Sequence, residues 1–512
     1  MQQFVNSPQL GGDQPGKSRP LFFVRLVFAF ACGAAMPFAY APYDLKWLAV
    51  LALAGWMLLM LPGRAGAIGY AFGLGWFGLG AWWLAPTLHT FGPLPWIWSG
   101  LAVVCVGAVL AAFPALLAWC AQLLAGGVRG RMLLLLPLLA VGEEWLRGHL
   151  LTGLPWTPPG SLLLDTPAIG LAAWLGVYGA SLLPFGLAAS IAALLSGSGV
   201  RQGFVALLIL LGAGYFAPQA WQADGAVHRV ALVQANIPQD LKWDAAFLER
   251  TMERYAALSE QAAQRSDLIV WPEAAVPMFL EHAPDWSQWL LEHMQAWDRP
   301  LLFGGLKLAD EGAVGGEPSG AGAHNGLFLY TPGSTALQFV GKQHLVPFGE
   351  YVPSWIPLLH KLVPGIADFR PTDDAGVLQP MGGRYGSLVC YEAIFPEQAR
   401  SRAQTASVLV NVTNDAWYGK TPASWQHMQA ARMRAVETGR YLLRAANTGV
   451  SAIIAPDGRV VSSIPWFTEG VVYGEYRDSS ARTFYLKNGD TPLLLLLIPL
   501  LIITIYPRRL TR

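Results

Sequence analysis

Long apolar runs fill the first 220 positions of the chain and return once near its end. A run of about 20 apolar residues is long enough for a helix to cross a lipid bilayer. The pattern therefore predicts eight membrane-spanning helices, near 21–41, 46–62, 67–86, 95–125, 132–150, 167–196, 202–219 and 491–507. The run at 95–125 is long enough to require a tilted helix or one that extends beyond the bilayer.

Basic residues predict the orientation of these helices. Lys17, Arg19 and Arg25 precede or begin the first run, and further arginines lie in alternate loops and after the last run: Arg64, Arg129, Arg131, Arg201, Arg508, Arg509 and Arg512. Cytoplasmic loops carry an excess of Lys and Arg. Eight spans with a cytoplasmic N-terminus place all of these residues on the cytoplasmic side. The loops on the opposite side carry almost no Lys or Arg, with Lys46 as the exception. The segment after the seventh span then lies outside the cytoplasm.

That segment has the polarity of a soluble domain. Its short apolar runs have strand character and alternate in part with helical patterns at 245–264 and 424–440; the runs are 230–235, 268–271, 301–305, 388–391 and 408–412. Strands that alternate with helices predict a layered α/β fold. The Gly-, Ala- and Ser-rich stretch 310–325 predicts a mobile loop.

We therefore predict three parts. A transmembrane bundle of about seven spans covers 1–222, an α/β domain covers 223–486, and a transmembrane helix with a cytoplasmic tail covers 487–512. The composition agrees, because 54% of the residues are hydrophobic and 13% are charged, against about 25% charged in soluble proteins. A net charge of +1 without a Lys/Arg-rich run argues against a nucleic-acid partner.

The four cysteines have neither paired nor metal-ligand spacing, so we expect no disulfide framework and no metal site. Cys32, Cys105 and Cys120 fall in apolar runs, where packing is the expected role, and Cys390 stands alone in the polar domain. Charges within a membrane span are often functional. Glu143, Glu144 and Arg147 lie toward the outer end of their run, which favours an interfacial ion pair that supports the domain; headgroup binding by Arg147 is the alternative.

Three side chains of the polar domain have the chemistry of acyl transfer. A thiol attacks a carbonyl as the thiolate, so Cys390 needs a base or a positive field nearby. Glu273 could accept the thiol proton, and Lys342 could stabilise an oxyanion or favour the thiolate. Taken singly, a buried cysteine usually serves packing and a lone Glu or Lys is usually solvated. The functional interpretation rests on the three residues together.

The motifs around these residues resemble a known superfamily. The stretches 271–273 (Trp-Pro-Glu), 341–350 (Gly-Lys-Gln-His-Leu-Val-Pro-Phe-Gly-Glu) and 389–392 (Val-Cys-Tyr-Glu) resemble the three signatures of the carbon–nitrogen hydrolase, or nitrilase, superfamily. With membrane spans on both sides, nearly the whole chain resembles the bacterial apolipoprotein N-acyltransferases. Further matching stretches are 146–148, 152–156, 239–244, 414–419 and 426–432.

The resemblance implies a fold and a reaction. The fold is an α-helical transmembrane bundle with a nitrilase-like α/β/β/α sandwich domain. The reaction is a ping-pong N-acyl transfer from the sn-1 position of a phospholipid donor to the α-amine of the N-terminal diacylglyceryl-cysteine of an apolipoprotein, in lipoprotein maturation. It implies no metal and no organic cofactor, and a location in the bacterial inner membrane with a periplasmic catalytic domain.

The resemblance also implies residue roles. Cys390 is the nucleophile that carries the acyl group as a thioester, Glu273 is the general base and later the general acid, and Lys342 stabilises the oxyanion. Glu350 orients Lys342 or the incoming amine. Residues that match positions associated with activity or substrate positioning are Trp243, Tyr391 and Glu392.

Two alternatives remain at this stage for the apolar stretch 345–370, which contains Phe348 and Trp355: core packing, or a lid at the bilayer surface that admits acyl chains. Two alternatives also remain for the function. One is a membrane-tethered nitrilase-type amidase, and the other is a transporter with a non-catalytic external domain. A Cys/His dyad with His344 or His427 is chemically available, but the Glu and Lys motifs make it unnecessary.

Overall fold

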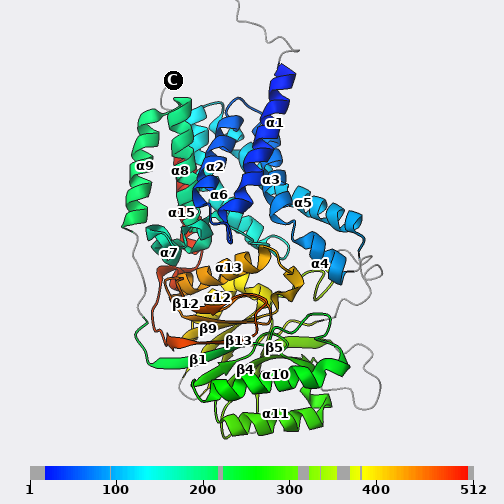
Figure 1. Cartoon of the computed structure of the whole chain (residues 1–512). Coiled ribbons are helices and arrows are strands. Elements are labelled where there is room, and N and C mark those ends of the chain that lie inside the picture. Colours follow the sequence, from blue (N-terminus) through cyan, green and yellow to red (C-terminus); the bar gives the residue numbers. More distant parts are fainter. Residues whose placement is uncertain are drawn as a thin grey trace, which may run out of the picture.

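Helices form the first part of the chain and a pair of stacked sheets forms the second (Figure 1). The computed structural model describes residues 18–505 except 93, 217–222, 310–321, 335, 354–368 and 381–382. The helical part consists of α1 (Ser18–Ala35), α2 (Lys46–Met60), α3 (Ala65–Gly80), α4 (Leu84–Phe91), α5 (Trp96–Ala125), α6 (Arg129–His149), α7 (Gly170–Ala180), α8 (Leu182–Ser196), α9 (Val200–Tyr215) and α15 (Thr491–Ile505).

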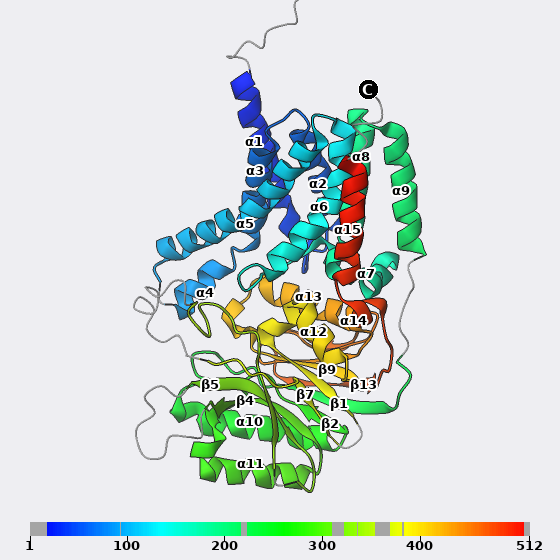
Figure 2. The ribbon, with the colours of Figure 1, turned by 180° about the vertical axis from the view of Figure 1, so that it is seen from behind.

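A helix lies within every predicted span, but the helices differ in length from the prediction. Among the described residues, two helical stretches are long and apolar enough to cross a membrane, Pro20–Ala39 and Trp96–Ala125. The stretch 167–196 passes this test only as a pair of helices bent by 68° at the break between them. The predicted span at 67–86 also contains a break, since α3 ends at Gly80 and the separate helix α4 follows. Figures 1 and 2 show that α5 runs obliquely to α2, α6 and α8.

Helix α3 packs between α1 and α5 through glycines. A Cβ atom added at Gly73 would lie 2.6 Å from Cα of Ala111 in α5, and one at Gly75 would lie 2.2 Å from the carbonyl oxygen of Phe30 in α1. Small residues let helix backbones approach closely, which is the main source of packing energy where lipid surrounds the helices. The glycine-rich composition of α3 therefore determines how tightly the three helices fit.

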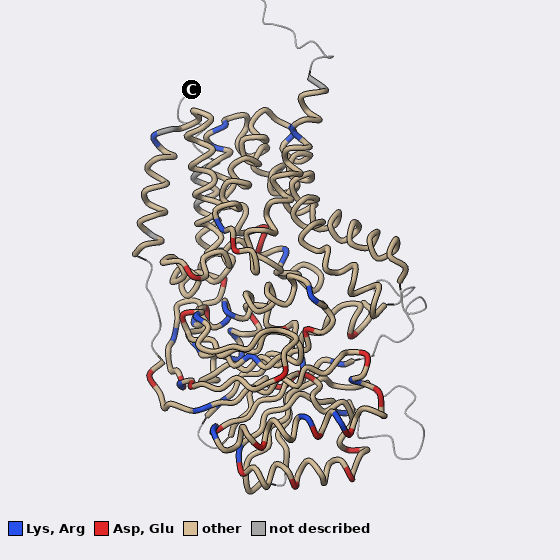
Figure 3. Tube along the Cα trace, in the orientation of Figure 1, with Lys and Arg blue, Asp and Glu red and all other residues tan. Residues whose placement is uncertain are grey.

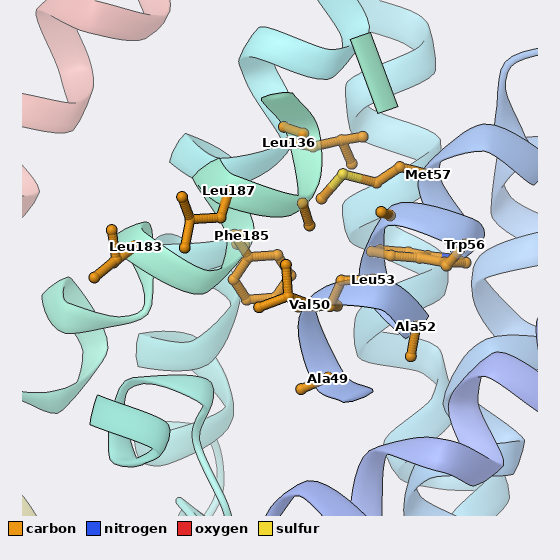
Figure 4. Packing of buried hydrophobic residues seen from close by; sticks show 14 of the residues in the cluster. Ala49, Val50, Ala52, Leu53, Trp56, Met57, Leu136, Leu183, Phe185 and Leu187 are labelled. Atoms are coloured by element: carbon orange, nitrogen blue, oxygen red, sulfur yellow. The ribbon is translucent and has the colours of Figure 1, made fainter. Parts of the chain in front are cut away.

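Helix α2 packs against α6 and α8 in a second apolar cluster. Figure 4 shows Met57 of α2 beside Leu136 of α6, and Val50 of α2 beside Phe185 of α8. All four side chains are buried. Charged residues are sparse throughout the helical part and dense in the second part (Figure 3), as the composition predicts.

The second part is a sandwich of two sheets. The first sheet has the order β13-β1-β2-β4-β5-β6, with β3 beside β4. Its strands are β1 (Val227–Gln234), β2 (Leu268–Val270), β3 (Val276–Phe279), β4 (Leu301–Leu308), β5 (Ala323–Tyr330), β6 (Gln338–Gly341) and β13 (Gly470–Arg477). The second sheet has the order β12-β11-β10-β9-β8-β7. Its strands are β7 (Val377–Leu378), β8 (Tyr385–Val389), β9 (Val408–Thr413), β10 (Leu442–Ala446), β11 (Ser451–Ile454) and β12 (Val460–Ile464).

Helices cover both outer faces of this sandwich. Helices α10 (Ala245–Ala263) and α11 (Pro284–Trp297) pack on the first sheet, and α12 (Pro396–Ala403) and α13 (Ala423–Thr438) pack on the second. Apolar side chains of both sheets form the core between them. The order helix, sheet, sheet, helix confirms the predicted α/β/β/α sandwich. In Figure 2 the α12 and α13 layer faces the helical part, and Met433 and Val436 of α13 join the core of the helical part.

One local prediction needs correction. The predicted loop at 310–325 lies outside the described residues up to 321, but 323–325 form the start of strand β5, so the prediction is wrong there. The predicted boundary at 486, which stays a prediction, falls within helix α14 (Phe484–Asn488), whose Leu486 packs with apolar residues of the second sheet, α12 and α13. The boundary at 222 falls among residues that are not described.

The predicted ion pair of α6 is present, but it is buried instead of interfacial. Nη2 of Arg147 lies 2.6 Å from Oε2 of Glu144, and the two side chains are 1% and 0% exposed. Nη1 of Arg147 donates hydrogen bonds to the carbonyl oxygens of Leu154 and Trp156, at 2.5 and 3.2 Å. The guanidinium therefore holds the loop that follows α6, which is a different role from the alternative of headgroup binding.

The glycine packing of α3 gives a stability prediction. Gly73→Leu should lower the midpoint of thermal unfolding of the detergent-solubilised protein by several degrees, because overpacking costs about 1–3 kcal/mol and the nearest neighbour is backbone. The control is Gly78→Ala on the same helix, where an added Cβ meets no atom within 4 Å. Equal midpoints for the two variants would contradict the close approach of α3 and α5.

Candidate active site

The three predicted catalytic side chains each follow the end of a strand. Glu273 lies two residues beyond Trp271, which follows β2, Lys342 follows β6, and Cys390 follows β8. Cys390 opens the short 3-10 helix η6 (Cys390–Ile394) with a backbone φ of 51°. A positive φ is uncommon for a residue with a side chain, so the structure holds the nucleophile candidate in a constrained turn.

Lys342 lies between two carboxylates. Its Nζ donates a hydrogen bond of 2.7 Å to Oε1 of Glu350 and lies 3.9 Å from Oε1 of Glu273. Its side chain is 1% exposed. Burial by itself would lower the pKa of Lys342, but the carboxylates of Glu350 and Glu273 outweigh it and hold the pKa above its usual value. Lys342 is therefore a fixed positive charge over the whole accessible pH range.

Glu273 is held by hydrogen bonds to both carboxylate oxygens. Nδ2 of Asn325 donates to Oε1 at 2.7 Å, and the backbone N–H of Asn414 donates to Oε2 at 2.9 Å. These donors come from the two different sheets, on β5 and after β9. The carboxylate is therefore fixed where the ends of the two sheets meet.

The Cys390 thiol is buried and keeps its proton at neutral pH. Burial and the charge of Glu273 raise its pKa, and the charge of Lys342 and a hydrogen bond with Thr413 act in the opposite direction without cancelling the rise. A thiol with a raised pKa needs a base during the reaction itself. Among the carboxylates, Glu273 has the largest effect on the pKa of the Cys390 thiol, so Glu273 is the candidate base.

The carboxylate of Glu392 accepts hydrogen bonds from backbone N–H groups of two different turns. Oε1 of Glu392 accepts the backbone N–H groups of Gln343 and His344, at 2.8 and 3.1 Å, and Oε2 accepts the N–H of Val389 at 2.7 Å. Arg402 pairs with the same carboxylate at 3.3 Å. Fully buried and bonded, Glu392 ties the Lys342 turn to the Cys390 turn. These contacts support the geometry of the site, and the predicted role of Glu392 in substrate binding stays a prediction.

The remaining expected substrate residues differ in exposure. Tyr391 is buried and its hydroxyl donates a hydrogen bond of 3.4 Å to the carbonyl of Gly153, in the loop held by Arg147. Phe348 and Trp243 expose 46% and 50% of their surface, so both can contact an incoming apolar group. Trp355 lies outside the described residues, and the lid interpretation stays a prediction.

The two histidines do not form the dyad that the sequence left available. His344 packs on Phe395 with ring centroids 3.8 Å apart, and burial, followed by the charge of Lys342, lowers its pKa to about 4. Nε2 of His427 lies 2.9 Å from the backbone oxygen of Cys390, so its ring contacts the nucleophile through the carbonyl.

Three residues that surround Glu273 were missed by the sequence analysis as individual site residues. Asn325 and Asn414 donate to its carboxylate, and Nζ of Lys242 donates a hydrogen bond of 2.8 Å to its backbone carbonyl. Lys242 and Asn414 lie inside the matching stretches 239–244 and 414–419, which is the signal that could have indicated them. Asn325 lies on a strand without such a motif.

Comparisons with known proteins show the family of the chain. Residues 229–484 match the family model described as carbon-nitrogen hydrolase, and residues 32–190 match that of the apolipoprotein N-acyltransferase N-terminal domain. An apolipoprotein N-acyltransferase from Nitrosomonas europaea is 38% identical over 499 residues, which cover 94% of this chain and 97% of that protein. One from Geobacter metallireducens is 36% identical over 449 residues, 84% of each chain. An amidase from Nesterenkonia sp. aligns with a TM-score of 0.38 at 19% identity, over 53% of this chain and 97% of that one.

The sandwich with its cysteine, glutamate and lysine is thus the carbon–nitrogen hydrolase domain of a larger acyl-transferring enzyme. The chain belongs to the apolipoprotein N-acyltransferase family, a family of bacterial membrane proteins that act in lipoprotein N-acylation. The family resemblance predicted from the motifs is confirmed, and the comparisons favour the acyltransferase over the amidase alternative.

Lys242 gives a prediction for the reactivity of the thiol. Burial lowers the pKa of Lys242 to about 8, against the opposing charges of Glu273 and Cys390, so the lysine is cationic below pH 8 and neutral above it. Lys242→Met should slow alkylation of Cys390 by iodoacetamide about tenfold at pH 7, equal to one unit of thiol pKa. The difference should shrink above pH 9, where wild-type Lys242 has lost its charge.

The measurement is the alkylation rate between pH 6.5 and 9.5, with Lys487→Met as the control because Lys487 is exposed on α14. A rate difference that is the same at every pH would contradict the electrostatic role and indicate a loss of packing.

Proposed function

We propose that this chain moves a fatty acyl group from a phospholipid to the α-amine of the N-terminal diacylglyceryl-cysteine of apolipoproteins, through a thioester on Cys390. The observation that carries the proposal is the buried Lys342 ammonium, held between Glu273 and Glu350 next to a buried thiol. This set supplies a nucleophile, a base and a fixed positive charge in one place.

In the first half-reaction, Sγ of Cys390 attacks the carbonyl carbon of the donor ester while Glu273 takes the thiol proton. Lys342 stabilises the negative charge that develops on the carbonyl oxygen. The carbon–oxygen bond of the ester then breaks, and protonated Glu273 gives its proton to the departing lysophospholipid oxygen. The products are the acyl-cysteine thioester and a lysophospholipid.

In the second half-reaction, the neutral α-amine of the acceptor attacks the thioester carbonyl and Glu273 accepts an amine proton. The carbon–sulfur bond breaks, and Glu273 returns a proton to the sulfur of Cys390. Glu350 keeps Lys342 in position throughout, since it accepts a hydrogen bond from Nζ and a second, of 2.7 Å, from the backbone N–H of Val346. The cycle is ping-pong because the lysophospholipid leaves before the amine enters.

Exclusion of water favours transfer over hydrolysis. Glu273, Lys342 and Cys390 are all less than 10% exposed, and shielding of this kind protects a reactive acyl intermediate. The exposed rings of Trp243 and Phe348 are suited to contact the acyl chains or the acceptor. The buried ring of Tyr391 packs against the loop at 153–156.

We further propose that the chain is a multi-pass protein of the bacterial inner membrane with its catalytic domain in the periplasm, divided at 1–222, 223–486 and 487–512. The alternating arginines support this topology. It is also supported by the N-terminal end of α1 and the C-terminal end of α15, which both lie on the side of the helical part remote from the sandwich (Figure 2).

A mass measurement tests the reaction. Wild-type protein incubated with phospholipid and no acceptor should gain one fatty acyl mass, and a diacylglyceryl-cysteine peptide should remove it with formation of the N-acyl peptide. Cys390→Ala should gain none, since it lacks the nucleophile. Intact-protein mass spectrometry reads both steps.

The matched control is Cys105→Ala, because Cys105 is an exposed cysteine of α5 and its loss should leave the adduct unchanged. Folded wild type without an adduct, together with release of ammonia from small amides, would overturn the acyltransferase mechanism and favour the amidase.

A further inference from the structure

A second cluster of polar side chains lies beneath the Cys390 turn and has no part in the mechanism described above. Its members come from β9, α13, β10 and the 3-10 helix η7 (Asp415–Tyr418), and each is at most 1% exposed: Asn411, Thr413, Asp415, His427 and Arg444. Burying charged groups is unfavourable unless they are paired and fully hydrogen-bonded. A cluster of this kind beside a reactive turn therefore points to a role in holding that turn.

The cluster contacts the nucleophile through His427. Nε2 of His427 lies 2.9 Å from the backbone oxygen of Cys390. A carbonyl oxygen only accepts, so Nε2 carries the hydrogen of this bond. Cys390 has a φ of 51°, a left-handed conformation that is unfavourable for a residue with a side chain and persists only where the surroundings enforce it. The His427 bond is one such enforcing contact.

Asp415 and Arg444 fix the other side of the ring. Nδ1 of His427 lies 3.0 Å from Oδ1 of Asp415 and 3.3 Å from Nη2 of Arg444. Burial by itself would raise the pKa of Asp415, but Arg444 and His427 lower it to about 2, so it is anionic. If Nδ1 carries a hydrogen, it can donate to Asp415; if Nδ1 carries none, it can accept from Arg444. In either state the hydrogen on Nε2 remains available to Cys390.

The same cluster forms hydrogen bonds with the turn at two further points. Arg444 bonds to the side-chain oxygen of Asn411, and Nδ2 of Asn411 donates a hydrogen bond of 2.8 Å to the carbonyl of Leu388, two residues before Cys390. Oγ1 of Thr413 lies 3.0 Å from Oδ1 of Asp415 and also contacts the Cys390 thiol, so its one hydroxyl hydrogen is available to either partner. One connected network therefore contacts the strand, the carbonyl and the sulfur of the nucleophile turn.

We propose that His427 is a positioning residue for acyl transfer: by donating to the Cys390 carbonyl, it maintains the left-handed turn that keeps the thiol beside Glu273 and Lys342. It takes up no proton from the thiol. The inference rests on the proposed role of Cys390 as nucleophile, and its test reads the geometry of Cys390 separately from acyl transfer.

Two substitutions separate the two ring nitrogens. The amide nitrogen of glutamine reaches about as far as Nε2, so His427→Gln keeps a donor for the Cys390 carbonyl. The shorter His427→Asn reproduces Nδ1 and loses that donor. Alkylation of Cys390 by iodoacetamide and the rate of acyl-adduct formation should stay close to wild type in His427→Gln, with an unchanged pH profile. Both rates should fall about 10- to 100-fold in His427→Asn, because a displacement of about 1 Å in a reacting group can cost about 100-fold in rate.

Equal losses in both variants, in proportion to their thermal stability, would overturn the proposal in favour of a purely structural role. A large loss in His427→Gln with a changed pH profile would overturn it in favour of a Cys/His dyad. If His427→Asn does not fold, His427→Gln carries the test alone, because its amide donates but does not accept a proton. Differences in alkylation without any acyl adduct in wild type would support the positioning role and refute the proposed reaction.

Discussion

The Lys342 ammonium is buried between the carboxylates of Glu273 and Glu350, and the rest of the site is arranged around that charge. A buried charge is tolerated only with well-placed partners, and each partner here is itself held by donors from a different segment, Asn325 and the backbone of Asn414 and Val346. With Lys242 the set contains two ammonium groups and two carboxylates. The buried charges therefore balance when all four are ionised, and the neutral thiol adds none until it reacts.

The same requirement explains why the site lies where the two sheets meet. No single strand presents a nucleophile, a base and a cation at hydrogen-bonding range, because neighbouring side chains on one strand point to opposite faces. Residues after β2, β6, β8 and β9 converge only when the sheets stack. Glu392 then fixes two of these turns to each other by accepting three backbone N–H groups. The catalytic groups are therefore aligned only when the core between the two sheets packs.

Much of this was predictable from the sequence. Apolar runs located the helices, and short runs at 230–235 and 408–412 located strands β1 and β9, because burial imposes these patterns directly. The motifs indicated Glu273, Lys342 and Cys390 together. The break near Ser181, the separate helix α4 and the β-strand at 323–325 were not predicted, since tertiary packing decides them. The buried role of Glu392 and the contact of His427 with the Cys390 carbonyl also depend on partners distant in sequence, which no local pattern encodes.

The loop that Arg147 holds beneath α6 belongs to the helical part, yet it forms part of the wall around the nucleophile. The carbonyl of Gly153 accepts the Tyr391 hydroxyl, and Nε1 of Trp156 donates to Gln426 of α13 at 2.8 Å. A sandwich domain translated and folded before the helices assemble would therefore lack one side of its pocket. The side of the Cys390 turn at Tyr391 is thus enclosed only when the helical part is in place, so the surroundings of the thiol are completed by two segments that are distant in sequence.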